Sequence, residues 1–138
     1  MVSFETFVHW PIVPVLFSCF WSILFLQSGL DKIQDWKGNL EWLTGHFSNS
    51  LFSGQVKVLL ALLTLTECLA GFSSFLGIGA IVLYGNYLFS FIGVLLSGIA
   101  LIMLFLGQRI AKDYAGAASL VPYFLAAVFN LWLLSTLS

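Results

Sequence analysis

Between Lys57 and Arg109 the sequence has a single charged side chain, Glu67, in about 51 residues. A helix needs about 20 mostly apolar residues to cross the hydrocarbon core of a bilayer, so this stretch can cross twice and turn once. A carboxyl group inside such a stretch is costly in lipid, and we expect it to face the protein interior and to have a partner. Glu67 therefore constrains how the surrounding helices pack.

The composition extends this interpretation to the whole chain. Of its 138 residues, 60% are hydrophobic and 8% are charged, whereas soluble domains average about 25% charged residues. We predict an all-α integral membrane protein, a bundle of four transmembrane helices that forms a single domain over residues 1–138. The predicted spans are residues 11–33, 55–76, 87–108 and 116–137. Nucleic-acid binding is not expected, because the sequence has no basic patch.

Glycine and proline residues mark breaks in or after these spans. Gly77 and Gly79 predict the end of the second span, and Gly85-Asn86 is another possible break, since glycine is a common helix terminator. Pro122 lies one turn into the fourth span, where it predicts a mild kink.

The segment between the first two spans has its own periodicity. Trp36, Leu40, Leu43 and Phe47 follow i, i+4, i+7, i+11 spacing, with charged residues on other faces. This pattern predicts a short amphipathic helix within residues 36–52 that lies in the headgroup region. An ordinary polar loop is the alternative.

The basic residues predict the orientation. All five fall in the first and third connections, which an even number of spans separates: Lys32, Lys37, Lys57, Arg109 and Lys112. The positive-inside rule places both connections in the cytoplasm and both termini outside.

Small residues recur at helical spacing on two spans. They are Ala61, Thr64, Cys68 and Gly71 on the second span, and Ser90, Gly93, Ser97 and Ala100 on the third. Small side chains let membrane helices approach closely, so these two stripes predict compact antiparallel packing of the second span against the third.

Glu67 shares a face of its helix with Thr64, and the helical rise places it about 16 Å from the inner end of the span. Ser22, Ser97 and Asn130 come out at similar depth, and each could donate a hydrogen bond to it. The candidate buried polar site is formed by Glu67, Thr64, Ser97 and Asn130.

Two interpretations of this site stay open. Burial disfavours the charged form of a carboxyl group, which favours a neutral, hydrogen-bonded Glu67 that only fixes helix packing. The functional alternative is a proton relay, or a polar contact to a quinone or lipid head group.

A second polar group lies near the inner end of the first span. It comprises Gln27, Asp31, Lys32 and Asp35, and Lys32 can pair with Asp35 at i+3. This group is either a solvated helix end or a docking surface for a lipid head group.

The two cysteines, Cys19 and Cys68, lie in apolar runs without a CxxC neighbour. They come out at similar depth by helical rise, and we interpret them as packing residues rather than a redox pair. No metal or bound cofactor is expected, although contact with a quinone or a lipid is possible.

At two places the sequence resembles the DoxX family. The first is the helix end at residues 24–33, with Gly29 and Lys32, and the second is Glu67 followed by Gly71. Residues 36–47 and 107–124 are similar to the Bacteroidota branch of the family. The loop lengths also match, so the resemblance covers nearly the whole chain, and these four residues carry over by position.

The resemblance implies a location and a role. Related DoxD proteins are small membrane subunits of quinol oxidase and thiosulfate:quinone oxidoreductase systems. The implied function is a non-catalytic accessory subunit of a larger quinol-linked respiratory complex in the bacterial inner membrane, with that complex and lipids as partners. The alternatives are an autonomous oxidoreductase-associated or proton-coupled protein centred on Glu67, and a membrane-complex assembly factor. We expect no catalytic activity of its own.

Overall fold

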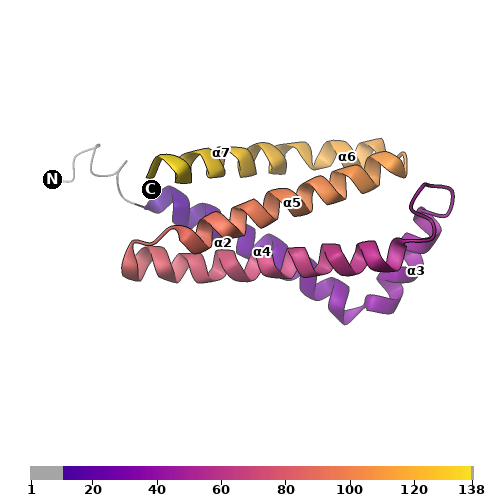
Figure 1. Ribbon diagram of the computed structural model, residues 1–138, viewed down its shortest axis with the longest axis horizontal. Helices are drawn as coiled ribbons and strands as arrows, with labels where there is room; N and C mark the ends of the chain where they lie inside the picture. Colours follow the sequence, from indigo (N-terminus) through magenta and orange to yellow (C-terminus); the bar gives the residue numbers. More distant parts are fainter. Residues whose placement is uncertain (1–10, 138) are drawn as a thin grey trace.

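A computed structural model describes residues 11–137 of the chain, and these residues form an all-helical bundle (Figure 1). The helices are α2 (Ile12–Gln34), α3 (Trp36–His46), α4 (Val56–Tyr84), α5 (Leu88–Ile110), α6 (Tyr114–Ser119) and α7 (Val121–Leu137). Four segments are long and apolar enough to cross a membrane, namely α2, α4, α5 and the α6–α7 pair. The predicted fold class is confirmed. Residues 1–10, which would place the N-terminus, lie outside the described part.

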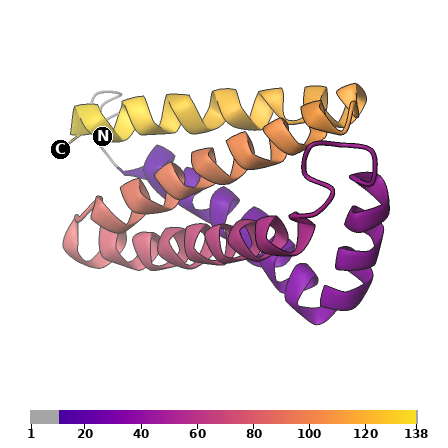
Figure 2. The same cartoon turned by 45° about the vertical axis from the view of Figure 1, so that its right-hand side comes forward.

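The amphipathic helix between the first two spans is α3, and it runs across one end of the bundle (Figures 1 and 2). It ends at His46, before the end of the predicted segment 36–52. The hydroxyls of Ser48 and Ser50 donate to the carbonyls of Gly45 and Phe47, each at 2.9 Å. Such local side-chain bonds offer the backbone an alternative to the helix, and the chain continues in turns to Gln55.

The second span is longer than predicted, because α4 continues through Gly77 and Gly79 to Tyr84. Gly77 serves close packing instead of termination, since a Cβ there would lie 2.8 Å from the backbone nitrogen of Ser90. The helix ends at Gly85, whose φ of 63° is left-handed and favours glycine. At 29 residues, α4 measures about 43 Å.

The fourth span is interrupted where only a mild kink was predicted. Helix α6 ends at Ser119, Leu120 lies between the helices, and α7 begins at Val121. Pro122 has no N–H to donate to the carbonyl of Ala118, and its ring crowds that carbonyl. The interruption therefore follows from the proline.

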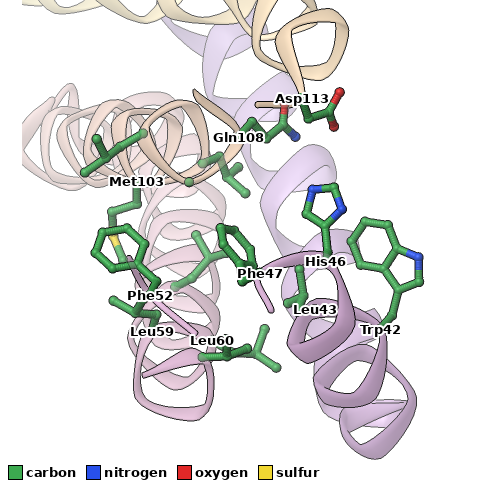
Figure 3. A pocket seen from close by; sticks show the side chains of 15 residues that line it. Trp42, Leu43, His46, Phe47, Phe52, Leu59, Leu60, Met103, Gln108 and Asp113 are labelled. Atoms are coloured by element: carbon green, nitrogen blue, oxygen red, sulfur yellow. The ribbon is translucent and has the colours of Figure 1, made fainter. Parts of the chain in front are cut away.

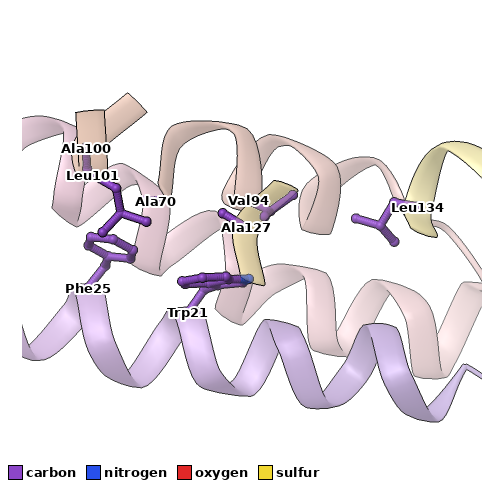
Figure 4. Close-up of a cluster of buried hydrophobic side chains, with 8 residues drawn as sticks. All are labelled: Trp21, Phe25, Ala70, Val94, Ala100, Leu101, Ala127 and Leu134. Carbon is purple, nitrogen blue, oxygen red and sulfur yellow. The ribbon is translucent and has the colours of Figure 1, made fainter. Parts of the chain in front are cut away.

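Helix α4 lies at the centre, packed against α2 on one side and α5 on the other, and α7 packs mainly on α5 (Figures 1 and 2). The apolar core is formed by Trp21, Phe25, Ala70, Val94, Ala100, Leu101, Ala127 and Leu134 (Figure 4). Three alanines and one valine from α4, α5 and α7 face the aromatic rings of Trp21 and Phe25 on α2. Bulky and small side chains therefore interdigitate at this level.

The predicted small-residue stripes contact different partners. On α5, Ser90, Gly93, Ser97 and Ala100 are all buried, and Gly93 lies against the backbone of Ser74. On α4, however, Cys68 and Gly71 face α2, while Ala61 is exposed. The predicted close packing of α4 against α5 is confirmed, but α4 makes that contact with Ser74 and Gly77. The assignment of Cys68 and Gly71 to this contact was wrong, because both lie against α2.

Candidate functional site

A buried ion pair joins α2 to α4. The Lys32 Nζ lies 3.2 Å from the Oε2 atom of Glu67, and the side chains of Lys32 and Glu67 are 17% and 0% exposed. The same ammonium group donates to the Ser28 hydroxyl at 2.7 Å and to the Ser28 carbonyl at 3.4 Å. The prediction that Glu67 faces the interior and bonds to another helix is confirmed.

Two glycines bring the helices close enough for this pair. A Cβ on Gly29 would lie 2.6 Å from the Cys68 sulfur, and one on Gly71 would lie 2.6 Å from the backbone nitrogen of Leu26. The backbones of α2 and α4 are therefore nearly in contact at Cys68 and Gly71, within the turn that follows Glu67. Lys32 lies in the last turn of α2, where a cation is favoured by the helix dipole.

The partner of Glu67 differs from the predicted ones. The hydroxyls of Ser22 and Ser97 donate to carbonyls of their own helices, at 2.9 and 2.7 Å. Thr64 likewise bonds to Leu60, at 2.7 Å. These hydroxyls have a backbone acceptor four or three residues back on the same helix, which removes their need for Glu67.

The position of Ser22 along α2 gives a second reason why it is not the partner of Glu67. Because Lys32 pairs with Glu67, Ser22 lies about 15 Å further along α2. The side-chain oxygen of Asn130 on α7 is buried and has no hydrogen-bond partner among the described residues. Within residues 11–137, no hydrogen bond links Ser97 or Asn130 to Glu67.

The second predicted polar group, near the inner end of the first span, also does not form one cluster in the structure. Gln27, Asp31 and Asp35 are exposed, whereas Lys32 is half-buried against α4. The predicted pair of Lys32 with Asp35 was wrong, because the ammonium group reaches Glu67 and Ser28 instead. The interior carboxylate has no water to solvate it, so it gains more from the lysine than the exposed Asp35 does.

Only one oxygen of the Glu67 carboxylate takes part in the ion pair. Oε2 of Glu67 accepts from Lys32, while Oε1 is buried without a partner in the described part of the chain. Neither Lys32 nor Glu67 lines either of the two described cavities. The chemistry available to the pair is thus a contact between two helices, with one carboxylate oxygen left over.

The cysteines do not form a pair. Cys19 and Cys68 are both free. Cys68 lies beside Gly29, which is ten residues or about 15 Å along α2 from Cys19, so the prediction that the two cysteines lie at similar depth was wrong. Among residues 11–137, no three His, Cys, Asp or Glu side chains come close enough to hold a metal ion.

One feature not predicted from the sequence is an apolar cavity of about 190 Å³ near the start of α4 (Figure 3). Its walls are Leu43 and Phe47 from α3 and the following turn, Leu59 and Leu60 from α4, and Met103 from α5. His46, Gln108 and Asp113 line one end of it. The helical spacing of Leu43 and Phe47 was a signal for an apolar face, but not for what that face covers.

The ring of His46 is held in place by aromatic neighbours at this cavity. It stacks on Trp42 with ring centroids 4.7 Å apart and meets the ring of Phe47 edge-on at 5.4 Å. Gln108 and Asp113 are adjacent, since a Cβ on Gly116 would contact side-chain oxygens of both. The Oε1 atom of Gln108 is buried without a described partner.

Comparison with known proteins adds no relative to this picture. The chain matches no protein-family model, no curated protein and no solved structure.

Proposed function

We propose that this chain is a non-catalytic accessory subunit of a larger quinol-linked respiratory complex in the bacterial inner membrane. The observation that supports it is that the charged pair inside the bundle serves a contact between α2 and α4 and lines neither described cavity. A transporter or proton channel would instead place its ionisable residues along a cavity. The resemblance to the DoxX family supplies the type of complex and is part of the proposal.

The surface of the bundle is consistent with a partner in the membrane. Helix α7 buries only Ala127, Asn130 and Leu134, while Trp132 and Phe129 are exposed. Helices from another subunit, or lipids, must cover these rings. We expect α7 to be the span that contacts the complex.

The proposed orientation follows from charge. Lys32, Lys37, Lys57, Arg109 and Lys112 all lie at or next to the inner end predicted for the spans, the end that carries α3. By the positive-inside rule this end faces the cytoplasm, and both termini face the periplasm. Labelling of a single cysteine at position 112 only from the periplasm would contradict this orientation.

The decisive experiment is purification of the native membrane assembly through a tag on this chain. Co-purification of respiratory subunits in fixed stoichiometry supports the proposal, whereas association only with immature subunits indicates an assembly factor. Turnover of quinol by the isolated chain in liposomes would overturn the non-catalytic role. Deletion should lower the yield of the complex more than the turnover of what remains.

One observation favours the proton-coupled alternative, namely the buried and unpartnered Oε1 atom of Glu67. Glu67→Gln keeps the shape and an oxygen acceptor for Lys32, but it cannot carry a proton. If the complex assembles with the glutamine variant and keeps its activity, the structural role stands. Loss of activity in an assembled complex supports proton transfer.

A further inference from the structure

The cavity beside α3 is large enough for a ligand. An apolar cavity of about 150 Å³ stays dry and binds benzene, and this one measures about 190 Å³. Figure 3 shows side chains of α3, α4 and α5 converging on it. Trp42 at its edge is 65% exposed, so the space opens toward the membrane interface predicted for α3.

The polar end of the cavity holds acceptor oxygens of Gln108 and Asp113, beside the Gln108 amide N–H₂ and the His46 imidazole. The buried Oε1 of Gln108 has no described partner, and Asp113 next to it uses Oδ1 to accept from the Gly116 backbone N–H at 3.0 Å. Asp113 forms no ion pair within residues 11–137. A buried acceptor without a donor costs free energy, so a ligand that donates a hydrogen bond there is favoured.

The charge at this end excludes one class of head group. Among the residues that the structure describes, no Lys or Arg side chain lines the cavity, while the Asp113 carboxylate does. The guanidinium of nearby Arg109 lies over the ring of Tyr114, 4.7 Å from its centroid, instead of over the cavity. A carboxylate head would therefore meet the like charge of Asp113 with no lysine or arginine beside it.

We infer that this cavity binds the hydrocarbon chain of an amphiphile whose head group donates hydrogen bonds and carries no negative charge. The chain lies between Phe47, Leu60 and Met103, and the head group reaches Gln108 and Asp113. Two sources share this chemistry, a lipid with a primary ammonium group and a neutral hydroxyl compound such as a quinol or lipid alcohol. The site goes beyond the proposed function, because it concerns the chain alone and needs no partner complex.

The test uses the full chain in phosphatidylcholine nanodiscs, since the choline head group has no N–H or O–H donor. Dodecylamine, dodecanol and dodecanoate share one chain length and differ only in the head group. Each is titrated and the bound number is counted by native mass spectrometry. We expect saturable binding of one dodecylamine or dodecanol, and binding of dodecanoate at least about tenfold weaker, as a 1.4 kcal/mol difference would give.

Three variants separate the chain site from the head site. Gly107→Leu projects a side chain toward Phe47, whose ring lies 3.4 Å from the position of a Cβ, and should abolish saturable binding. Gln108→Leu should weaken amine and alcohol binding about threefold to tenfold. The control Gln34→Leu, on an exposed residue outside the cavity, should change nothing.

Asp113→Asn tests the charge without loss of the fold, since asparagine caps a helix as well as aspartate does. It should bring the affinities of dodecylamine and dodecanoate together. It also keeps the inference testable if Gly107→Leu does not fold.

Equal affinity of the three probes for the wild-type chain, or no saturable binding, would overturn the inference. If dodecylamine binds at least about tenfold more tightly than dodecanol, the head group is an ammonium. If dodecanol binds as tightly or more tightly, it is a hydroxyl. Co-purification of the native complex is independent of these results, so failure of one proposal is distinguishable from failure of the other.

Discussion

Two neighbouring regions of α4 are built in opposite ways. At Glu67 the helix meets α2 through glycines, and an ion pair closes the contact. One turn earlier, from Leu63 back to Val56, the same helix borders an apolar cavity. The contact is closed because Gly29 and Gly71 remove side chains between two backbones, whereas the cavity is bordered by α3 and a turn, which do not run along α4.

This difference in packing predicts how well the α2–α4 contact and the cavity each tolerate a substitution. A close backbone contact cannot relax without moving a whole helix. A cavity has room for additional atoms. The two regions should therefore respond differently to the same substitution, and the following variants test that expectation.

Lys32→Met should have the largest effect. It leaves the fully buried Glu67 without its cation, and breaking a buried pair by removing one partner costs about 3–5 kcal/mol. Reversible unfolding in mixed micelles measures the loss. Lys57→Met is the matched control, since Lys57 is exposed in the first turn of α4. An equal loss of stability in that variant would contradict a specific role for the pair.

The double variant Lys32→Met with Glu67→Met should recover most of that loss. Replacement of a buried pair by apolar side chains of similar volume is often close to neutral, so the double variant should lie within about 2 kcal/mol of wild type. The thermodynamic cycle of single and double variants measures the coupling. Additive losses would mean that the two side chains do not depend on each other.

Gly71→Ala should destabilise the closed region by about 1–3 kcal/mol, because overpacking forces a backbone shift. The new methyl group would lie 2.6 Å from the backbone nitrogen of Leu26. Gly79→Ala on the same helix is the control, since nothing lies within 4 Å of its Cβ position. Thermal unfolding of the two variants compares them, and equal melting temperatures would contradict the close contact.

Gly107→Ala at the cavity should have the smallest effect. Its methyl group would lie 3.4 Å from the ring of Phe47, an ordinary contact. Alanine is favoured over glycine in a helix by about 0.5–1 kcal/mol, so we expect no loss and a small gain of stability. A loss as large as that of Gly71→Ala would mean that the two regions are equally tight.

The partner of Glu67 illustrates what could be predicted from the sequence. An interior carboxyl with a bond to another helix was predictable, because lipid offers no alternative. Lys32 was not identified, since depth estimates from predicted span ends placed it at the surface near Asp35. The lysine side chain is long, and it reaches inward from the helix end to the carboxylate.

The cavity at α3 could not be predicted in the same way. The amphipathic pattern of 36–52 identified an apolar face, but His46 is about 60 residues from Gln108 and Asp113 and shares no motif with them. Their proximity depends on how the turn after α3 folds against α4 and α5. A local pattern contains no information on that geometry.

The sequence by itself determined the number of spans and the helix between the first two, because hydropathy and helical periodicity act within about 20 residues. Gly85 and Pro122 also act locally, but the continuation of α4 past Gly77 and the full interruption of the fourth span were not predicted. Only the tertiary structure decided that Gly71 faces α2, that Lys32 bonds to Glu67 and that α3 borders a cavity. These contacts depend on the register of one helix against another, which small side chains permit at several positions and which the packing of all the helices together selects.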